Sequence, residues 1–212
     1  MATSRTTTKP SARERLLAAA DELFYAEGVR SVGIDRVIEH AGVAKASLYN
    51  TFGGKEQLIR AYLDTRHAGI TGRITDAVDS RDTPRERLLA VFEAQGALFG
   101  EPDFHGCAFI RASAEAGPGS LVEEAADNYR AWLRELFTRL AGEAGAADPQ
   151  SLGRQLHLLY DGAGISARMD RDPSAAVAAR AAASALIAAG TAAGTADVGR
   201  TGPAVTVASA LG

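Results

Sequence analysis

The sequence predicts an all-α protein, and three observations lead to this fold class. Helix-start signals recur along the chain, apolar residues between them repeat at close to 3.6 residues, and no long segment alternates apolar and polar residues as a strand does. The 212 residues are 46% apolar and 23% charged. This ordinary globular composition excludes a collagenous, disulfide-stapled or wholly disordered chain.

The helices are predicted from how each one begins. An N-cap residue is followed by proline at the first helical position, by a carboxylate three residues on, or by both. Such starts are found at Ser11 with Glu14, Thr83-Pro84 with Glu86, Ser120 with Glu123, Asp148-Pro149 and Asp172-Pro173. With the apolar periodicity, they predict helices at residues 11–27, 34–41, 45–51, 55–80, 84–100, 107–115, 120–142, 149–169 and 173–190.

Neither end of the chain has the pattern of a packed core. Residues 1–10 are polar, which predicts a flexible basic arm, and residues 191–212 are rich in Gly, Ala and Thr, which predicts a disordered tail. The apolar stretch Ala175–Ala196 is mostly alanine and carries Arg180, too weakly hydrophobic for a confident membrane span. We therefore expect a cytoplasmic protein without a membrane partner.

Cysteine and catalytic motifs are scarce. Cys107 is the only cysteine, so no intrachain disulfide or Cys-x-x-Cys metal site is possible, and we expect a small buried side chain rather than a redox sensor. No nucleophile elbow, phosphate loop or His/carboxylate pair at metal spacing occurs. The expectation is a protein that is not an enzyme and has no cofactor or metal.

A helix, a three-residue turn and a second helix are predicted within Ile34–Phe52. Gly42 permits the positive φ of the turn, and the second helix, from about Lys45, buries Leu48 at its centre. This geometry inserts a second helix into the major groove of DNA. Two short helices joined at glycine also occur in many all-α proteins, so a purely structural helix-turn-helix is an alternative.

The outward side chains of the second helix favour DNA. Lys45 can reach guanine or a phosphate, and Ser47 and Asn50 are short groups suited to base edges. Tyr49 and Thr51 can donate to phosphate oxygens. The next helix then opens at Gly53-Gly54-Lys55, where free N–H groups and the lysine charge suit an anion.

The segment Ala41–Leu58, AGVAKASLYNTFGGKEQL, resembles the DNA-binding signature of the tetracycline-repressor (TetR/AcrR) family, with Phe24, Gly28 and Val37 at the expected distance before it. The resemblance covers about residues 11–60. It implies an all-α homodimer with a three-helix DNA-binding domain at residues 11–54 and an effector-binding and dimerisation domain at 55–190. It also implies that DNA is faced by Lys45, Ala46, Ser47, Tyr49, Asn50 and Thr51, with Lys55 on the DNA backbone.

Five positions depart from the family pattern. Ala44 stands where Ser or Thr often caps the recognition helix, and Thr51 stands where His is common. Val32-Gly33 replaces a Thr-capped start, and Asp35 places an anion near an expected phosphate contact. These departures leave the operator sequence and the affinity open.

The larger domain combines a few aromatic residues with many alanines. This composition fits either a packed core or an apolar ligand cavity, and the family resemblance favours the cavity. The predicted ligand-binding residues are Phe92, Phe99, Phe104, Cys107, Trp132 and Tyr160. Polar points in such a cavity would come from Gln95, His105, Arg111, His157 and Asp161.

Small residues at helical spacing in the last two predicted helices permit close packing, which in this family pairs two copies. The resulting hypothesis is a repressor of a near-palindromic double-stranded DNA operator, released by a small-molecule effector. Two alternatives stay open: an all-α small-molecule-binding protein or helical enzyme, and a TetR-like regulator without a metabolite ligand.

The net charge of −3 argues against nonspecific attachment to nucleic acid, but the charge is unevenly distributed. Residues 1–60 contain nine basic and seven acidic side chains, so the acidic excess lies in the remainder. Arg5, Lys9, Arg13 and Arg15 form the densest basic run, which is either a solvated terminus or an arm along DNA.

Overall fold

The computed structural model describes residues 10–198, and side chains up to residue 192. These described residues form nine α-helices and no strand, which confirms the predicted all-α class. The helices are α1 (Ala12–Glu27), α2 (Ile34–Ala41), α3 (Lys45–Phe52), α4 (Lys55–Asp79), α5 (Pro84–Phe99), α6 (Ala108–Glu115), α7 (Leu121–Glu143), α8 (Pro149–Asp170) and α9 (Ala175–Val198).

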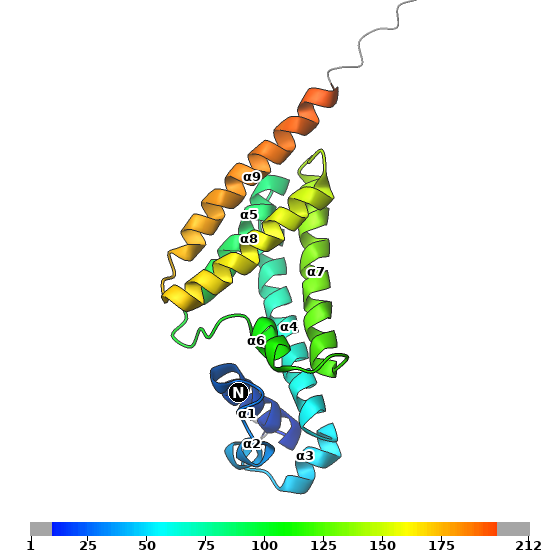
Figure 1. The fold of residues 1–212 in the computed structure, drawn as a ribbon, viewed down its shortest axis with the longest axis vertical. Coiled ribbons are helices and arrows are strands. Elements are labelled where there is room, and N and C mark those ends of the chain that lie inside the picture. Colours follow the sequence, from blue (N-terminus) through cyan, green and yellow to red (C-terminus); the bar gives the residue numbers. More distant parts are fainter. Residues whose placement is uncertain (1–9, 199–212) are drawn as a thin grey trace, which may run out of the picture.

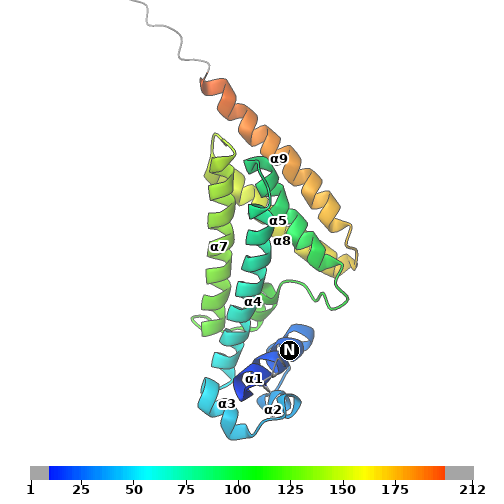
Figure 2. The ribbon, with the colours of Figure 1, turned by 180° about the vertical axis from the view of Figure 1, so that it is seen from behind.

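The molecule consists of a small head and a longer body. Helices α1–α3 form the head at one end, and α4 runs from the head into the body (Figure 1). Within the body α4 packs against α5 and α7, α7 against α8, and α9 against α5 and α8. The view from behind shows α4, α5 and α7 alongside one another, with α9 at the outside (Figure 2). No linker separates head and body, because α4 belongs to both.

The capping residues explain most helix starts. Ser11 with Glu14 and Thr83 with Glu86 form complete capping boxes, as predicted. At α7 only half of the predicted box forms: the Ser120 hydroxyl accepts from the Glu123 N–H, but the Glu123 carboxylate accepts from the Gly119 N–H instead.

Two predicted boundaries near the carboxyl end were wrong. Asp172 accepts a hydrogen bond from the Ser174 N–H, so helix α9 begins at Ala175 rather than 173. It then continues to Val198, so residues 191–198 are helical and are not part of a disordered tail. Alanine has the highest helix propensity, and the run of alanines carries the helix past its last large apolar residue. The predicted tail at 199–212, and the arm residues Arg5 and Lys9, lie outside the described residues.

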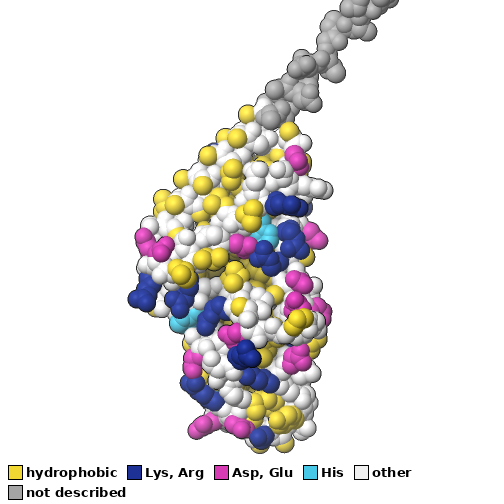
Figure 3. Space-filling model, viewed as in Figure 1, with side chains coloured by type: hydrophobic (Ala, Val, Ile, Leu, Met, Phe, Trp, Pro, Cys, Tyr) yellow, Lys and Arg dark blue, Asp and Glu magenta, His cyan; other side chains and the backbone are white. Residues whose placement is uncertain are grey.

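Helix α9 has an unusual surface. By length and composition alone, its stretch Ala175–Ala192 is apolar enough to cross a membrane, with a mean hydropathy of 1.4, and only 17% of it is buried. Its apolar character comes mainly from alanine, and Arg180 in the middle of the stretch pairs with Glu93 of α5 at 2.7 Å. Exposed apolar side chains also gather over α8 and α9 (Figure 3).

Candidate nucleic-acid interface and ligand cavity

The turn between α2 and α3 is fixed by the backbone of Gly42. Its φ of +60° lies in the left-handed region, where glycine is favoured, and its N–H donates to the carbonyls of Ile38 and Glu39. Arg15 of α1 braces the same turn, donating from Nη1 to the carbonyls of Ala41 and Gly42 at 3.3 and 2.8 Å. The helix-turn-helix is therefore held as a rigid unit. Arg15 acts inside the head, not as part of a flexible arm.

Helix α3 buries its two large apolar residues and leaves most of its polar residues exposed. Leu48 is fully buried and Phe52 nearly so, where the Arg13 guanidinium lies 5.1 Å from the Phe52 ring centroid. Most of the predicted DNA-facing residues are accessible: Lys45, Ala46, Tyr49, Asn50 and Thr51 are exposed, and Ser47 is half-buried. The structure thus brings the predicted residues onto one accessible surface. Their contact with DNA stays a prediction.

Two helix starts in the head have no side-chain cap. Ala44 precedes α3 and Gly33 precedes α2, and neither has a side chain that accepts a hydrogen bond from the helix, as the departures from the family pattern predict. The first N–H groups of α3 are consequently without a capping side chain. Such groups are suited to a phosphate oxygen.

Lys45 forms an ion pair in the DNA-free protein. Its Nζ lies 2.8 Å from the Asp35 Oδ1, and both side chains are exposed. The hydrogen bond from Lys45 to the Asp35 carboxylate raises the pKa of Lys45. Lys45, which the sequence assigns to DNA contact, is therefore already paired with the Asp35 carboxylate at the amino end of the recognition helix.

Lys55 lies at the start of α4 and is half-buried. Burial lowers the pKa of Lys55, and the nearby Glu115 carboxylate partly opposes that shift. Lys55 and Glu115 line a groove between the head and the α6–α7 connection. Glu115 also accepts from the Arg30 N–H at 2.6 Å, which ties α6 to the head.

A second feature is a partly open cavity in the body, with a volume of about 70 Å³. Its wall is mostly apolar and is assembled from α1, α4, α5, α6, α7, α8 and the segment between α5 and α6. The lining residues are Tyr25, Arg66, Ile70, Arg73, Gln95, Leu98, Phe99, Glu101, Phe104, Gly106, Cys107, Ala108, Ile110, Tyr129, Tyr160, Asp161 and Gly164.

Four of the six predicted ligand-binding residues line this cavity: Phe99, Phe104, Cys107 and Tyr160. Two do not. The Phe92 ring packs against the rings of Phe137 and Tyr160, with centroids 5.8 and 6.2 Å apart, and fills the core. Trp132 lies one helical turn from Tyr129 and packs against His67 of α4. Aromatic residues of one helix point to different neighbours, which sequence spacing alone does not resolve.

Only some of the polar residues predicted for the cavity line it. Gln95 and Asp161 line the cavity, whereas His105, Arg111 and His157 do not. The Gln95 Nε2 donates to the Tyr160 carbonyl at 2.8 Å. The hydroxyls of Tyr129 and Tyr160 lie 3.5 Å apart, and burial raises the pKa of both tyrosines.

Cys107 is half-buried in the cavity wall. Burial raises the pKa of the Cys107 thiol, so the protonated form is favoured, as in a small apolar side chain.

Sequence reasoning missed Tyr25 and Arg66. Tyr25 follows the buried Phe24 in α1, so it reads as an ordinary helix residue with no signal that it reaches the body. Arg66 reads as a solvated charge on α4, but its guanidinium lies 3.7 Å from the Tyr25 ring centroid and pairs with Asp21.

A helix-turn-helix head with an exposed polar recognition face, continued by a helical body that encloses an apolar cavity, defines a class of all-α DNA-binding proteins. The comparisons with known proteins specify the family. Residues 16–62 match the family described as "Bacterial regulatory proteins, tetR family". The chain belongs to the TetR family.

The solved structures agree over more than four fifths of the chain. SCO4454, a TetR-family transcriptional regulator from Streptomyces coelicolor, is 36% identical with a TM-score of 0.81, over 85% of this chain and 96% of that one. The reduced form of NemR from E. coli is 25% identical with a TM-score of 0.73, over 81% of this chain and 94% of that one.

Among curated relatives, the transcriptional regulator LmrA of Bacillus subtilis is 31% identical over 124 residues, which are 57% of this chain and 66% of LmrA. The transcriptional activator FasR of Mycolicibacterium smegmatis is 34% identical over 39% of this chain and 37% of FasR. The chain therefore covers less than two thirds of the length of these curated relatives.

Proposed function

We propose that this TetR-family protein is a cytoplasmic, homodimeric repressor that binds a near-palindromic operator and leaves it when a small molecule occupies the body cavity. The observation that carries the proposal is helix α3, whose apolar side is buried while its polar side is exposed. Relatives support the sign of regulation, because NemR and KstR2 are named transcriptional repressors, although FasR is named an activator. This is a binding function rather than an enzymatic one.

Two domains divide the work. Residues 11–54 form the DNA-binding domain, and residues 55–190 form the effector-binding and dimerisation domain, with α9 extending beyond it. Because α4 starts directly after the recognition helix and ends in the body, a shift in the body changes the orientation of the head.

The exposed face of α8 and α9 supports a homodimer. Four large apolar side chains are exposed there: Leu158, Ile165, Met169 and Val177. Figure 3 shows apolar side chains gathered over α8 and α9, and a second copy of this face would bury such side chains. A two-fold dimer presents two recognition helices roughly 34 to 36 Å apart, or a multiple of that, which calls for a near-palindromic operator.

The cavity supports an apolar effector. Its lining is dominated by aromatic and aliphatic side chains, with a few polar groups such as Gln95 and Asp161 that can orient a ligand. The effector acts only to the extent that it binds the released conformation more tightly than the DNA-binding one.

The test is binding to the promoter DNA that flanks the protein's own gene, measured by fluorescence anisotropy at low and moderate salt. The Tyr49→Ala variant should lose affinity, because it removes a contact from each of two heads. The matched control is Arg85→Ala, which removes an exposed cation from α5, far from α3. If no specific binding occurs at low salt and Tyr49→Ala behaves like the wild type, the proposal fails.

A thermal-shift screen of small apolar compounds tests the effector half of the proposal separately. A compound that occupies the cavity raises the melting temperature and lowers operator affinity. Operator binding without any stabilising compound would indicate a regulator that has no metabolite ligand. Ligand binding without DNA affinity would indicate a binding protein with a structural helix-turn-helix.

A further inference from the structure

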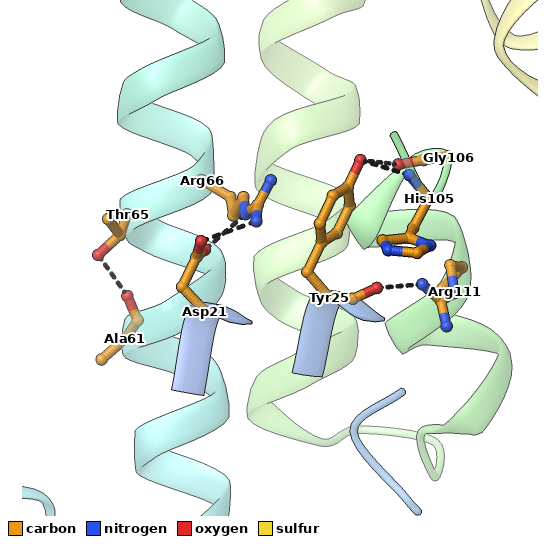
Figure 4. Close-up of polar contacts among 8 residues, drawn as sticks. All are labelled: Asp21, Tyr25, Ala61, Thr65, Arg66, His105, Gly106 and Arg111. Carbon is orange, nitrogen blue, oxygen red and sulfur yellow. Dashed lines mark hydrogen bonds and ion pairs between the residues drawn. The ribbon is translucent and has the colours of Figure 1, made fainter. Parts of the chain in front are cut away.

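One residue of the DNA-binding head forms part of the cavity in the body. Tyr25 lies on α1, and among the described residues of the head it is the one that lines the cavity. Its hydroxyl donates to the Gly106 carbonyl at 3.0 Å and accepts from the His105 N–H at 3.1 Å. Figure 4 shows the ring reaching from α1 to the segment before α6. A single side chain therefore joins head, cavity and body.

The Tyr25 ring is held on both sides. The Arg66 guanidinium of α4 lies against one face, while Arg66 forms two hydrogen bonds to Asp21 of α1, at 2.5 and 2.8 Å. The His105 ring meets Tyr25 edge-on at 5.4 Å, and Arg111 of α6 donates to the Tyr25 carbonyl (Figure 4). Tyr25 is thus positioned before any ligand arrives.

The cavity is too small for an ordinary effector. Ligand pockets in proteins typically measure about 300 to 1,000 Å³. This cavity measures about 70 Å³, so a ligand larger than a few atoms must displace part of the lining. Most of the lining belongs to helices packed on several sides, whereas residues 101–107 belong to no helix and include Phe104, Gly106 and Cys107.

Two further contacts between head and body lie beside Tyr25, from Arg111 to its carbonyl and from Arg66 to Asp21. Another lies elsewhere: Glu115 of α6 accepts from the Arg30 N–H, next to the hydrogen bond from the Leu121 N–H to Glu56 at 3.1 Å. These last two contacts border the groove beside Lys55 and not the cavity. A ligand in the cavity would therefore act directly on the Tyr25 contacts and leave the groove contacts in place.

We propose that the Tyr25 hydroxyl and the backbone of His105 and Gly106 form a latch that reports cavity occupancy to the DNA-binding head. An apolar ligand displaces residues 101–107, both hydrogen bonds of the Tyr25 hydroxyl break, and α1 loses its anchor on that segment. The latch rests on the proposed function, since it couples the cavity to operator binding. By linkage, operator binding favours the closed latch and the empty cavity.

The first experiment compares Tyr25→Phe with Tyr160→Phe. Each variant removes one hydroxyl from the cavity wall, but the Tyr160 hydroxyl contacts only Tyr129 within the body. Tyr25→Phe keeps the ring and its contact with Arg66. Hydrogen–deuterium exchange at the His105 amide should become roughly tenfold faster in Tyr25→Phe and stay unchanged in Tyr160→Phe. Equal exchange in both variants would overturn the latch.

The second experiment fills the cavity covalently. Cys107 is the only thiol in the chain and lines the cavity, so benzyl methanethiosulfonate at alkaline pH attaches a ring there, with intact mass as the check. The adduct should lower operator affinity at least tenfold in the wild type and in Tyr160→Phe. In Tyr25→Phe, where the latch is already open, the adduct should change affinity less than threefold.

The outcomes separate the two proposals. If the unmodified wild type does not bind its operator, the proposed function fails. If the wild type binds and the adduct weakens Tyr25→Phe as much as the wild type, the latch is wrong while the function stands. If Cys107 does not react in the folded protein, the exchange experiment alone decides. If it reacts, the Cys107→Ser variant, which should be unaffected by the reagent, shows that the reagent acts at no other group.

Discussion

Replacing Asp35 by Asn should strengthen operator binding. In the DNA-free protein the Asp35 Oδ1 lies 2.8 Å from the Lys45 Nζ, and 79% of the Asp35 side chain is exposed. Lys45 has to leave this carboxylate to reach a phosphate, and the carboxylate itself repels DNA. The amide of Asn has a similar shape but no charge, so the change removes both effects and leaves the start of α2 intact.

The magnitude follows from the salt dependence. Each additional phosphate contact steepens the dependence of log K on log salt by about 0.9. With one Lys45 in each head of a dimer, the slope steepens by up to about 1.8, so affinity falls up to roughly tenfold more between 50 and 200 mM salt. Stability should hardly change, because exposed ion pairs contribute little to folding.

The assay is fluorescence anisotropy on the operator across this salt range. Asp64→Asn is the matched control, because Asp64 is also exposed and paired, with Arg60 at 2.9 Å, but its partner lies on α4 and not on the recognition helix. The reasoning is refuted if Asp35→Asn binds no more tightly than wild type at low salt, or if its salt slope equals that of Asp64→Asn.

Three further predictions concern stability. Gly153→Ala should destabilise the protein by about 1 to 3 kcal/mol, because the new Cβ would lie 2.9 Å from the Thr138 backbone nitrogen; Gly72→Ala, with open space around it, should stabilise by up to about 1 kcal/mol. Urea denaturation checks both, and stability changes of the same sign in the two variants would contradict the close approach of Gly153 to Thr138 of α7. Leu48→Ala removes a fully buried side chain and should cost about 2 to 5 kcal/mol; a variant that melts like wild type would show that the recognition helix is not anchored there. Burial lowers the pKa of His67, so its neutral form is favoured in the folded state. Because the unfolded chain then binds more protons, the free energy of unfolding should fall as the pH drops below about 6.5. His67→Phe should reduce this fall, and wild-type and variant stabilities that change in parallel with pH would refute the prediction.

Local chemistry explains why the helix starts were predictable. The Ser11 and Glu14 side chains satisfy N–H groups within one turn of their own helix, so the signal and its structural effect lie within four residues. Gly42 acts locally as well, because the turn needs a positive φ. The failures arose at α9, where Asp172 caps a turn before the helix and alanine carries the helix past the predicted end.

The exposure of the predicted DNA-facing residues was also predictable from sequence. Leu48 and Phe52 lie four residues apart on one face and are buried, so the polar side chains Lys45, Tyr49 and Asn50 were expected to be accessible, and they are exposed. The pairing of Lys45 with Asp35 needed the tertiary structure, because the two residues lie on different helices whose angle depends on the turn.

The sequence by itself determined the helical class, the helix-turn-helix and the residues on its outer face, because each depends on periodicity and caps within a few residues. Only the tertiary structure decided which residues enclose the cavity. Seven parts of the chain contribute to its wall. Phe92 packs in the core instead, Trp132 packs against His67, and Tyr25 reaches the cavity from the DNA-binding head. Packing between distant segments is a property of the whole fold, and no local pattern carries it.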